Sequence, residues 1–198
     1  MALVKNIDEL DLNGSYTYAD YLNWQLGEYI ELIKGKVFRM SPAPAVRHQK
    51  ISMRLTGAFY NALNNQPCQL FAAPFDVRLY HKNKKTGEPA QTVVQPDLCV
   101  ICDESKLDEQ GCDGAPDLIM EILSPGNSKK EMKDKFEVYE ESGVKEYWLV
   151  HPSEKTVVIY HLNAEGIYVG SRPYTDEHTI TTPIIPHLLL NLSQVFAD

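Results

Sequence analysis

A chain of 198 residues with 43% hydrophobic and 23% charged residues has the length and composition of one globular domain, residues 1–198, with a hydrophobic core. No run approaches the ~20 apolar residues of a membrane-spanning helix, and acids near the N-terminus argue against a signal peptide, so we expect a cytoplasmic protein. The net charge of −8 argues against tight binding of duplex nucleic acid by the surface as a whole.

The first predicted element is a short helix. It follows a loose N-terminal lead-in of residues 1–14. Thr17 and Asp20 have the spacing of a capping box, which predicts a helix start, and Gly27 marks the expected end.

A β-hairpin is predicted next, with strands at 29–33 and 36–40. Glu31 lies in the first strand, between Ile30 and Leu32. It is either an acid on the exposed face of the hairpin or a third carboxylate of a functional site, and the sequence leaves both open.

Residues 46–63 predict a long helix, because the break at 41–44 is followed by apolar residues at helical spacing. His48 precedes Ile51 by three residues and so lies on the same side, near the start of the helix. A histidine at such a place is more often a satisfied boundary residue than a functional one.

Two strands are predicted at 69–80 and 93–101, separated by a polar loop at 82–89. The alternation in the first strand makes Asp76 an ordinary outward-facing residue. In the second, Pro96 marks a strand start, an edge or a bulge, and such irregularities often direct a side chain such as Asp97 into a site.

After a loop at 103–116, residues 117–123 predict a strand that is buried on both faces. Leu118, Met120 and Ile122 share one face, and Glu121 lies on the other. A carboxylate buried there needs a metal, a cation or hydrogen-bond donors, because burial without partners costs several kcal/mol.

The next helix offers a cation. Ser128 and Glu131 have the spacing of a capping box, and Gly143 marks the end of the helix. Lys135 lies close to its apolar stripe, whereas Lys130 and Lys133 face water; the stripe consists of Met132, Phe136 and Tyr139.

The C-terminal third predicts strands at 146–150, 156–162 and 167–171, and a final helical turn at 192–196. Helices therefore flank a mostly central sheet, which makes the fold α/β or α+β.

Several other kinds of site find little support. The chain has no glycine-rich phosphate-binding loop and no G-x-S-x-G motif. Cys99 and Cys102 have the spacing of half a zinc site, but no second pair matches them. We therefore expect all four cysteines to be reduced core thiols; the other two are Cys68 and Cys112.

Carboxylates on two neighbouring strands with a lysine beside them suit a Mg²⁺ or Mn²⁺ ion next to a phosphodiester, because Mg²⁺ takes one or two hard carboxylates and keeps waters. Asp97, Glu121 and Lys135 are these residues. Three local basic clusters stand out in an acidic chain, and each is more often a solvated face than a binding site: Arg47, Lys50 and Arg54; Lys82, Lys84 and Lys85; Lys129, Lys130 and Lys133.

The chain resembles the Uma family of putative restriction-endonuclease-like proteins, within the PD-(D/E)XK nuclease superfamily. Eight short matches in order carry the resemblance over most of residues 16–196: 29–35, 40–42 with 47–49, 73–79, 94–98, 114–118, 121–125, Lys135 with Tyr139, and 143–150. The superfamily's usual acid-x-lysine motif has Leu123 at the lysine position here, and Lys135 on the following helix takes its place.

The resemblance implies a restriction-endonuclease-like core, in which a mixed central β-sheet is flanked by helices and extended by extra β-hairpins. It implies Asp97 and Glu121 as metal ligands, with the Ile122 carbonyl as a third. Glu31 completes the acidic cluster, and His48 also matches a family position. Nucleases of this superfamily often dimerise, so a homodimer is expected.

The leading hypothesis is a Mg²⁺- or Mn²⁺-dependent endonuclease that acts on DNA. Two alternatives stay open: a catalytically inactive binding or assembly module in which Lys135 pairs with the acids, and a nuclease of RNA or branched DNA. The acidic surface also leaves room for a partner protein that supplies affinity for DNA.

Overall fold

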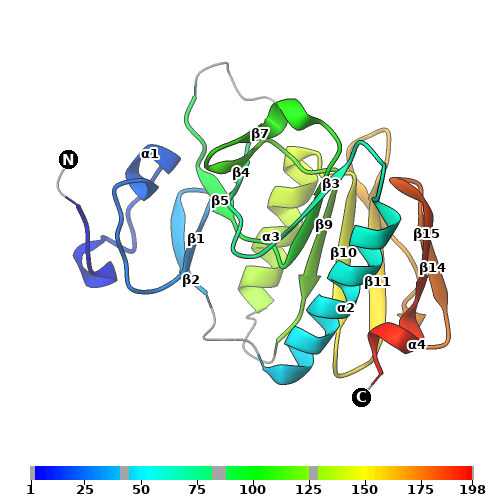
Figure 1. Ribbon diagram of the computed structural model, residues 1–198. Coiled ribbons are helices and arrows are strands. Elements are labelled where there is room, and N and C mark those ends of the chain that lie inside the picture. The colour runs from blue at the N-terminus through cyan, green and yellow to red at the C-terminus, as the bar shows by residue number, and fades with distance from the viewer. Residues whose placement is uncertain (1–2, 41–44, 82–87, 125–128, 198) are drawn as a thin grey trace.

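The computed structural model describes residues 3–40, 45–81, 88–124 and 129–197, which form a mixed α+β fold around two sheets (Figure 1). In the central sheet, β9 and β10 are parallel neighbours and the other pairs are antiparallel. Its strand order is β12 (Tyr168–Gly170), β11 (Thr156–Leu162), β10 (Glu146–His151), β9 (Leu118–Ile122), β6 (Leu98–Ile101) and β3 (Gln69–Ala72), and β13 (Tyr174–Thr175) also pairs with β11.

The second sheet packs against one face of the first. Its strand order is β2 (Lys36–Arg39), β1 (Ile30–Ile33), β5 (Thr92–Val94), β4 (Val77–Leu79), β8 (Gly111–Asp113) and β7 (Leu107–Asp108). The predicted hairpin at 29–40 is confirmed as β1 and β2.

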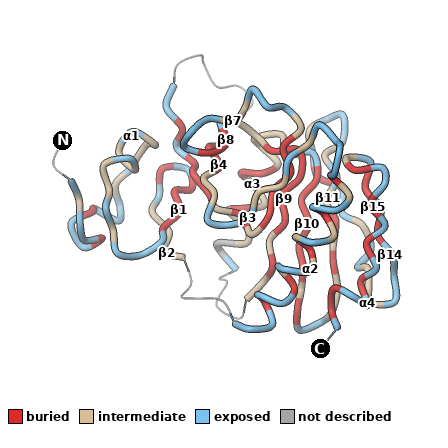
Figure 2. Tube along the Cα trace, viewed as in Figure 1, coloured by how far each residue is buried: buried red, intermediate tan, exposed pale blue. Residues whose placement is uncertain are grey.

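Helices cover both faces of the central sheet, as predicted. Helix α2 (Val46–Ala62) lies on one face, together with α4 (Leu192–Val195) and the hairpin of β14 (Thr179–Thr182) and β15 (Ile185–Asn191). Helix α3 (Lys129–Ser142) lies on the other face, and the core strands between them are buried (Figure 2).

Strand β9 confirms the predicted alternation. Leu118, Met120 and Ile122 pack into the core on the α2 side, and Ile119 packs on the α3 side. Glu121 therefore belongs to the face that α3 covers, which is the position a strand period of two requires.

Two of the predicted strands are each interrupted. The run at 69–80 divides into β3 and β4, with a cis Ala73–Pro74 bond between them. The run at 93–101 divides into β5 and β6, and Pro96 lies between them, so it marks an interruption of the strand. In both cases the two halves belong to different sheets, and the chain passes from one sheet to the other at the break.

Other expectations were wrong in extent. The predicted loop at 103–116 contains β7, β8 and the 3₁₀ helix η2 (Glu104–Lys106). Helix α1 (Tyr18–Tyr21) is shorter than expected, although its capping box between Thr17 and Asp20 is present. The lead-in carries a 3₁₀ helix, η1 (Ile7–Glu9), and Ile7 and Leu10 pack with Ile30 in a small separate core.

The cysteine expectation was wrong for one pair. Cys68 and Cys102 form a disulfide, whereas Cys99 and Cys112 are free and buried. Cys68 precedes β3 and Cys102 follows β6, and these strands pair antiparallel from Gln69 opposite Ile101. The two cysteines therefore face each other one step beyond the ladder.

Some sequence-based expectations fall outside the described residues: the capping role of Ser128 and the lysines at 82, 84 and 85. Among the described residues, no helix is long and apolar enough to span a membrane.

Candidate active site

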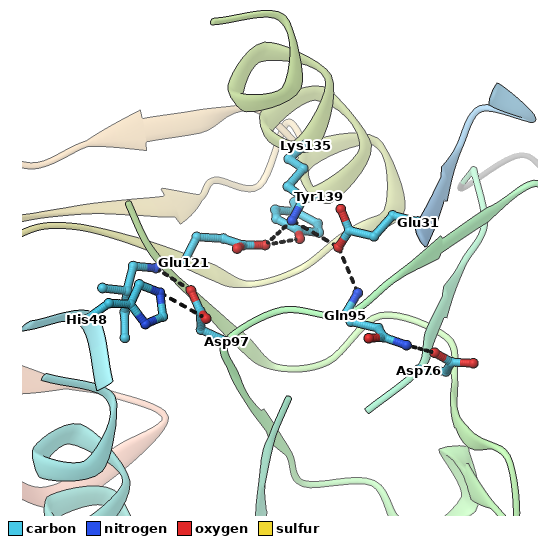
Figure 3. A network of polar contacts seen from close by, with 9 residues as sticks. Glu31, His48, Asp76, Gln95, Asp97, Glu121, Lys135 and Tyr139 are labelled. Carbon is cyan, nitrogen blue, oxygen red and sulfur yellow. Dashed lines mark hydrogen bonds and ion pairs between the residues drawn. The ribbon is translucent and has the colours of Figure 1, made fainter. Parts of the chain in front are cut away.

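Glu121 forms the centre of a buried polar cluster between β9 and α3 (Figure 3). Lys135 and Tyr139 lie one helical turn apart on α3 and both contact the same oxygen, Glu121 Oε1. The Lys135 Nζ lies 3.0 Å from it, and the Tyr139 hydroxyl donates to it at 2.6 Å. The prediction that Lys135 projects from the inner face of the helix is confirmed, since this lysine is only 6% exposed.

Glu31 joins the cluster from the second sheet. Its Oε1 lies 3.0 Å from Lys135 Nζ and accepts a hydrogen bond from the backbone N–H of Gln95 at 2.9 Å. The side chain is 2% exposed, which decides between the two alternatives: Glu31 does not lie on an exposed hairpin face. Lys135 therefore bridges two carboxylates that come from different sheets.

Asp97 lies beside this cluster, at the start of β6. Its Oδ2 accepts the backbone N–H of Ile122 at 2.7 Å, and its Oδ1 lies 3.3 Å from His48 Nε2 at the start of α2. His48 is buried, and its polar partner is Asp97. It approaches the cluster from α2, on the opposite side of β9 to α3 (Figure 3).

The pKa values in this cluster follow from burial and charge. Burial raises the pKa of Glu121 to about 7; Lys135 lowers it, and the neighbouring Asp97 and Glu31 raise it. Burial lowers the pKa of Lys135, but the two glutamates outweigh it, so this pKa is raised and Lys135 stays charged. Burial also lowers the pKa of His48, and the contact with Asp97 outweighs this effect, so the pKa is raised.

These residues fit a hard divalent cation in charge and ligand type. The cluster holds three carboxylates and one ammonium; burial is the main cause of the raised pKa of Glu121, and the neighbouring Asp97 and Glu31 raise it further. Among the residues that the structure describes, no three acidic, histidine or cysteine side chains gather around one point. Asp97 and Glu121 are the two carboxylates that the sequence predicts as ligands, and two is a number that suits Mg²⁺, which retains waters.

Further residues of the network were missed. Asp76, expected to point outward, accepts hydrogen bonds from Gln95 Nε2 at 2.7 Å and from the Tyr21 hydroxyl at 3.3 Å (Figure 3). Gln95 thereby links Asp76 to Glu31. Tyr139 was predicted only as part of the apolar stripe. Its position four residues after Lys135 puts both side chains on the same face of the helix, so a shared contact with Glu121 could have been predicted.

Comparisons with known proteins agree with this architecture. A family model described as "Uma2: Putative restriction endonuclease" matches residues 18–193. An uncharacterized protein from Synechocystis, slr1290, is 25% identical over 150 residues, which is 74% of each chain. A crystal structure described as a putative nuclease belonging to DUF820, from Anabaena variabilis, aligns with a TM-score of 0.71 and 21% identity over 92% of this chain and 98% of that one.

Proposed function

Because the chain belongs to the Uma2 family of putative restriction endonucleases, we propose that it is a Mg²⁺- or Mn²⁺-dependent endonuclease that hydrolyses phosphodiester bonds of DNA. One observation carries this proposal: Glu121 and Glu31 come from two sheets to the buried Lys135, and Asp97 lies beside Glu121, where it accepts the N–H of the next residue, Ile122. Buried carboxylates are costly, so a core that served stability alone would place apolar side chains at these positions.

Asp97 and Glu121 would hold the ion, together with the backbone carbonyl of Ile122. A bound Mg²⁺ or Mn²⁺ supplies Lewis-acid polarisation of a phosphate oxygen and a lowered pKa for a bound water.

We assign Lys135 the role of orienting the attacking water or of stabilising the charge that develops on the phosphate. An ammonium has three N–H donors, and the contacts with Glu121 and Glu31 use two of them. We assign the third donor to a reactant. The pKa of Lys135 is raised, so the side chain acts as a charged donor and not as a base.

His48 and Glu31 are positioning residues in this proposal. His48 contacts Asp97 Oδ1 while the Ile122 N–H holds Oδ2, so both carboxylate oxygens have a fixed direction. Glu31 is fixed by the Gln95 N–H and in turn holds Lys135.

Cleavage of supercoiled plasmid and of single-stranded DNA at low salt, with Mn²⁺ or Mg²⁺, tests the proposal. The wild-type chain is expected to cut, and an Asp97→Asn variant prepared in parallel is expected not to cut. The absence of cutting by either protein on DNA, RNA and branched substrates would refute the nuclease assignment. Equal cutting by both would refute the role of Asp97.

A second candidate is a catalytically inactive binding or assembly module of the same fold. The observation that favours it is the tight pairing of Lys135 with two glutamates, which would stabilise the acids without a metal. Thermal unfolding separates the two: a midpoint that rises with Mn²⁺ in the wild type and not in Asp97→Asn favours the nuclease, and a midpoint independent of metal favours the module.

The homodimer, the partner protein and the cytoplasmic location also stand as proposals. Sedimentation of the purified chain tests whether it forms a homodimer.

A further inference from the structure

Helix α2 differs from the rest of this acidic chain in charge. The chain has a net charge of −8, but the 17 residues of α2 include no aspartate or glutamate and three cationic residues, Arg47, Lys50 and Arg54. Such a helix gives a local positive field in an otherwise negative protein, and such a field attracts anionic ligands.

The three cations do not have equal roles. The Arg54 guanidinium donates to the backbone carbonyls of Val195 and Ala197, so it ties the C-terminal segment to α2. Arg47 and Lys50 are exposed, and within the described part of the chain their side chains form no ion pair with a carboxylate. The positive charges that have no carboxylate partner among the described residues, Arg47 and Lys50, thus lie in the first turns of the helix.

These turns adjoin the candidate active site. His48, the residue after Arg47, reaches Asp97 on the inner side of α2. Arg47 lines two hollows near the start of the helix. The first, of about 390 Å³, also involves Lys50 and Arg54; the second, of about 380 Å³, involves His48, Leu123, His151 and Pro152.

One of the residues that line the second hollow has an unsatisfied polar atom. His48 is 8% exposed, and its Nδ1 is buried without a hydrogen-bond partner in the described residues. The walls also include apolar side chains, Leu123 and Pro152, beside the cationic Arg47. A site with one apolar side and one cationic side suits a nucleotide unit, which has an anionic phosphate and a base whose face packs on apolar side chains.

From this geometry we propose that the first turns of α2 bind the sugar-phosphate backbone of the nucleic-acid substrate next to the bond that is cut. Arg47 and Lys50 contact successive phosphates, and the hollow between α2 and the turn after β10 holds the nucleotide nearest to Asp97. The inference rests on the proposed function for the position of the cut bond, but the binding surface itself is defined by α2 and the hollow beside it.

The test is fluorescence anisotropy of labelled single-stranded DNA, duplex DNA and RNA with the purified chain in EDTA, over a series of salt concentrations. Each phosphate contact contributes roughly 0.7 (single strand) to 0.9 (duplex) to the slope of log affinity against log salt. The Arg47→Gln/Lys50→Gln variant is therefore expected to bind more weakly and to flatten the slope by roughly 1.4 to 1.8.

The matched control is Arg172→Gln/Lys5→Gln, which removes the same charge from exposed positions between β12 and β13 and in the N-terminal segment. It should leave affinity and slope unchanged. Equal effects of the two double variants would mean that only net charge matters and would overturn the proposal, as would the absence of binding to all three probes.

Failure of this inference and failure of the proposed function give different results. Binding is measured without metal, so a chain that binds through Arg47 and Lys50 but never cleaves refutes hydrolysis and leaves the surface standing. A chain that cleaves with unchanged KM and unchanged salt slope after both substitutions refutes the surface and leaves the nuclease assignment standing.

Discussion

Replacement of Lys135 by methionine tests the central electrostatic argument. The ammonium is the only cation that the structure places within 4.0 Å of Glu31 and Glu121 in the described chain, and the side chains of the three residues are 8%, 2% and 12% exposed. Removal of one partner from a buried ion pair typically costs about 3 to 5 kcal/mol, because a charge is left buried and unpaired. We expect Lys135→Met to lose about that free energy of unfolding at pH 8.

The loss should depend on pH in a defined direction. Lys135 is the main group that lowers the pKa of Glu121, which is already about 7, so its removal raises that pKa further. A carboxyl whose pKa is higher in the folded than in the unfolded state binds more protons when folded, so stability falls as pH rises through the folded pKa. The variant should therefore recover much of its stability at pH 5.

Urea unfolding followed by tryptophan fluorescence measures both effects, since Trp148 is fully buried against Phe59. Lys133→Met is the matched control on the same helix. Its side chain is 74% exposed, and its one ion pair with the described residues is with Glu137 at 3.6 Å, so its loss should cost no more than about 0.5 kcal/mol. Equal losses for the two variants at pH 8, or no recovery at pH 5, would refute the buried ion cluster.

Two further variants probe neighbouring parts of the structure. Tyr139→Phe removes the hydroxyl that donates a hydrogen bond to Glu121. A hydrogen bond to a charged group is worth about 1.5 to 3 kcal/mol, so urea unfolding at pH 8 should show a loss of stability of that size. An unchanged unfolding midpoint would contradict the contact. Reduction of the Cys68–Cys102 disulfide, which spans 34 positions, should lower stability by about 3 to 4 kcal/mol in the chain-entropy model, and the double serine variant should match the reduced wild type and no longer respond to reductant. Two free thiols per non-reduced chain, counted under denaturing conditions, are expected, and four would refute the disulfide.

The predictions from sequence were accurate where a pattern is local. Alternation in β9 and helical spacing in α3 put Glu121 and Lys135 on facing surfaces, because strand and helix periods fix the direction of each side chain. The relevant residues span only 14 positions. The strand period and the helix period were therefore enough to predict the contact between Glu121 and Lys135.

Sequence reasoning was weaker where contacts depend on long-range pairing. Glu31 meets Lys135 only because β1 joins the second sheet through β5, where Leu32 pairs with Val93. Asp76 was assigned to an outward face on the assumption of one continuous strand, and the break between β3 and β4 changed its direction. The disulfide would have followed from the pairing of β3 with β6, which no local pattern shows.

The charge of the cluster leads to a last prediction, which joins fold to function. In formal charge, three carboxylates and one ammonium leave two negative charges in a largely buried place, which one divalent cation would balance. Because a ligating carboxylate must be deprotonated, protons compete with the metal. With a Glu121 pKa of about 7, we expect Mn²⁺ to raise the thermal midpoint clearly at pH 8 and little at pH 5.

The magnitude and the control follow from the same linkage. At a free Mn²⁺ concentration a hundredfold above its dissociation constant, the stabilisation is about 2.7 kcal/mol. Glu121→Gln should abolish it at both pH values, since the amide neither titrates nor supplies the negative charge. A Mn²⁺ shift that persists at pH 5, or that survives in Glu121→Gln, would place the ion elsewhere and would leave Lys135 as the only counter-ion that the buried acids require.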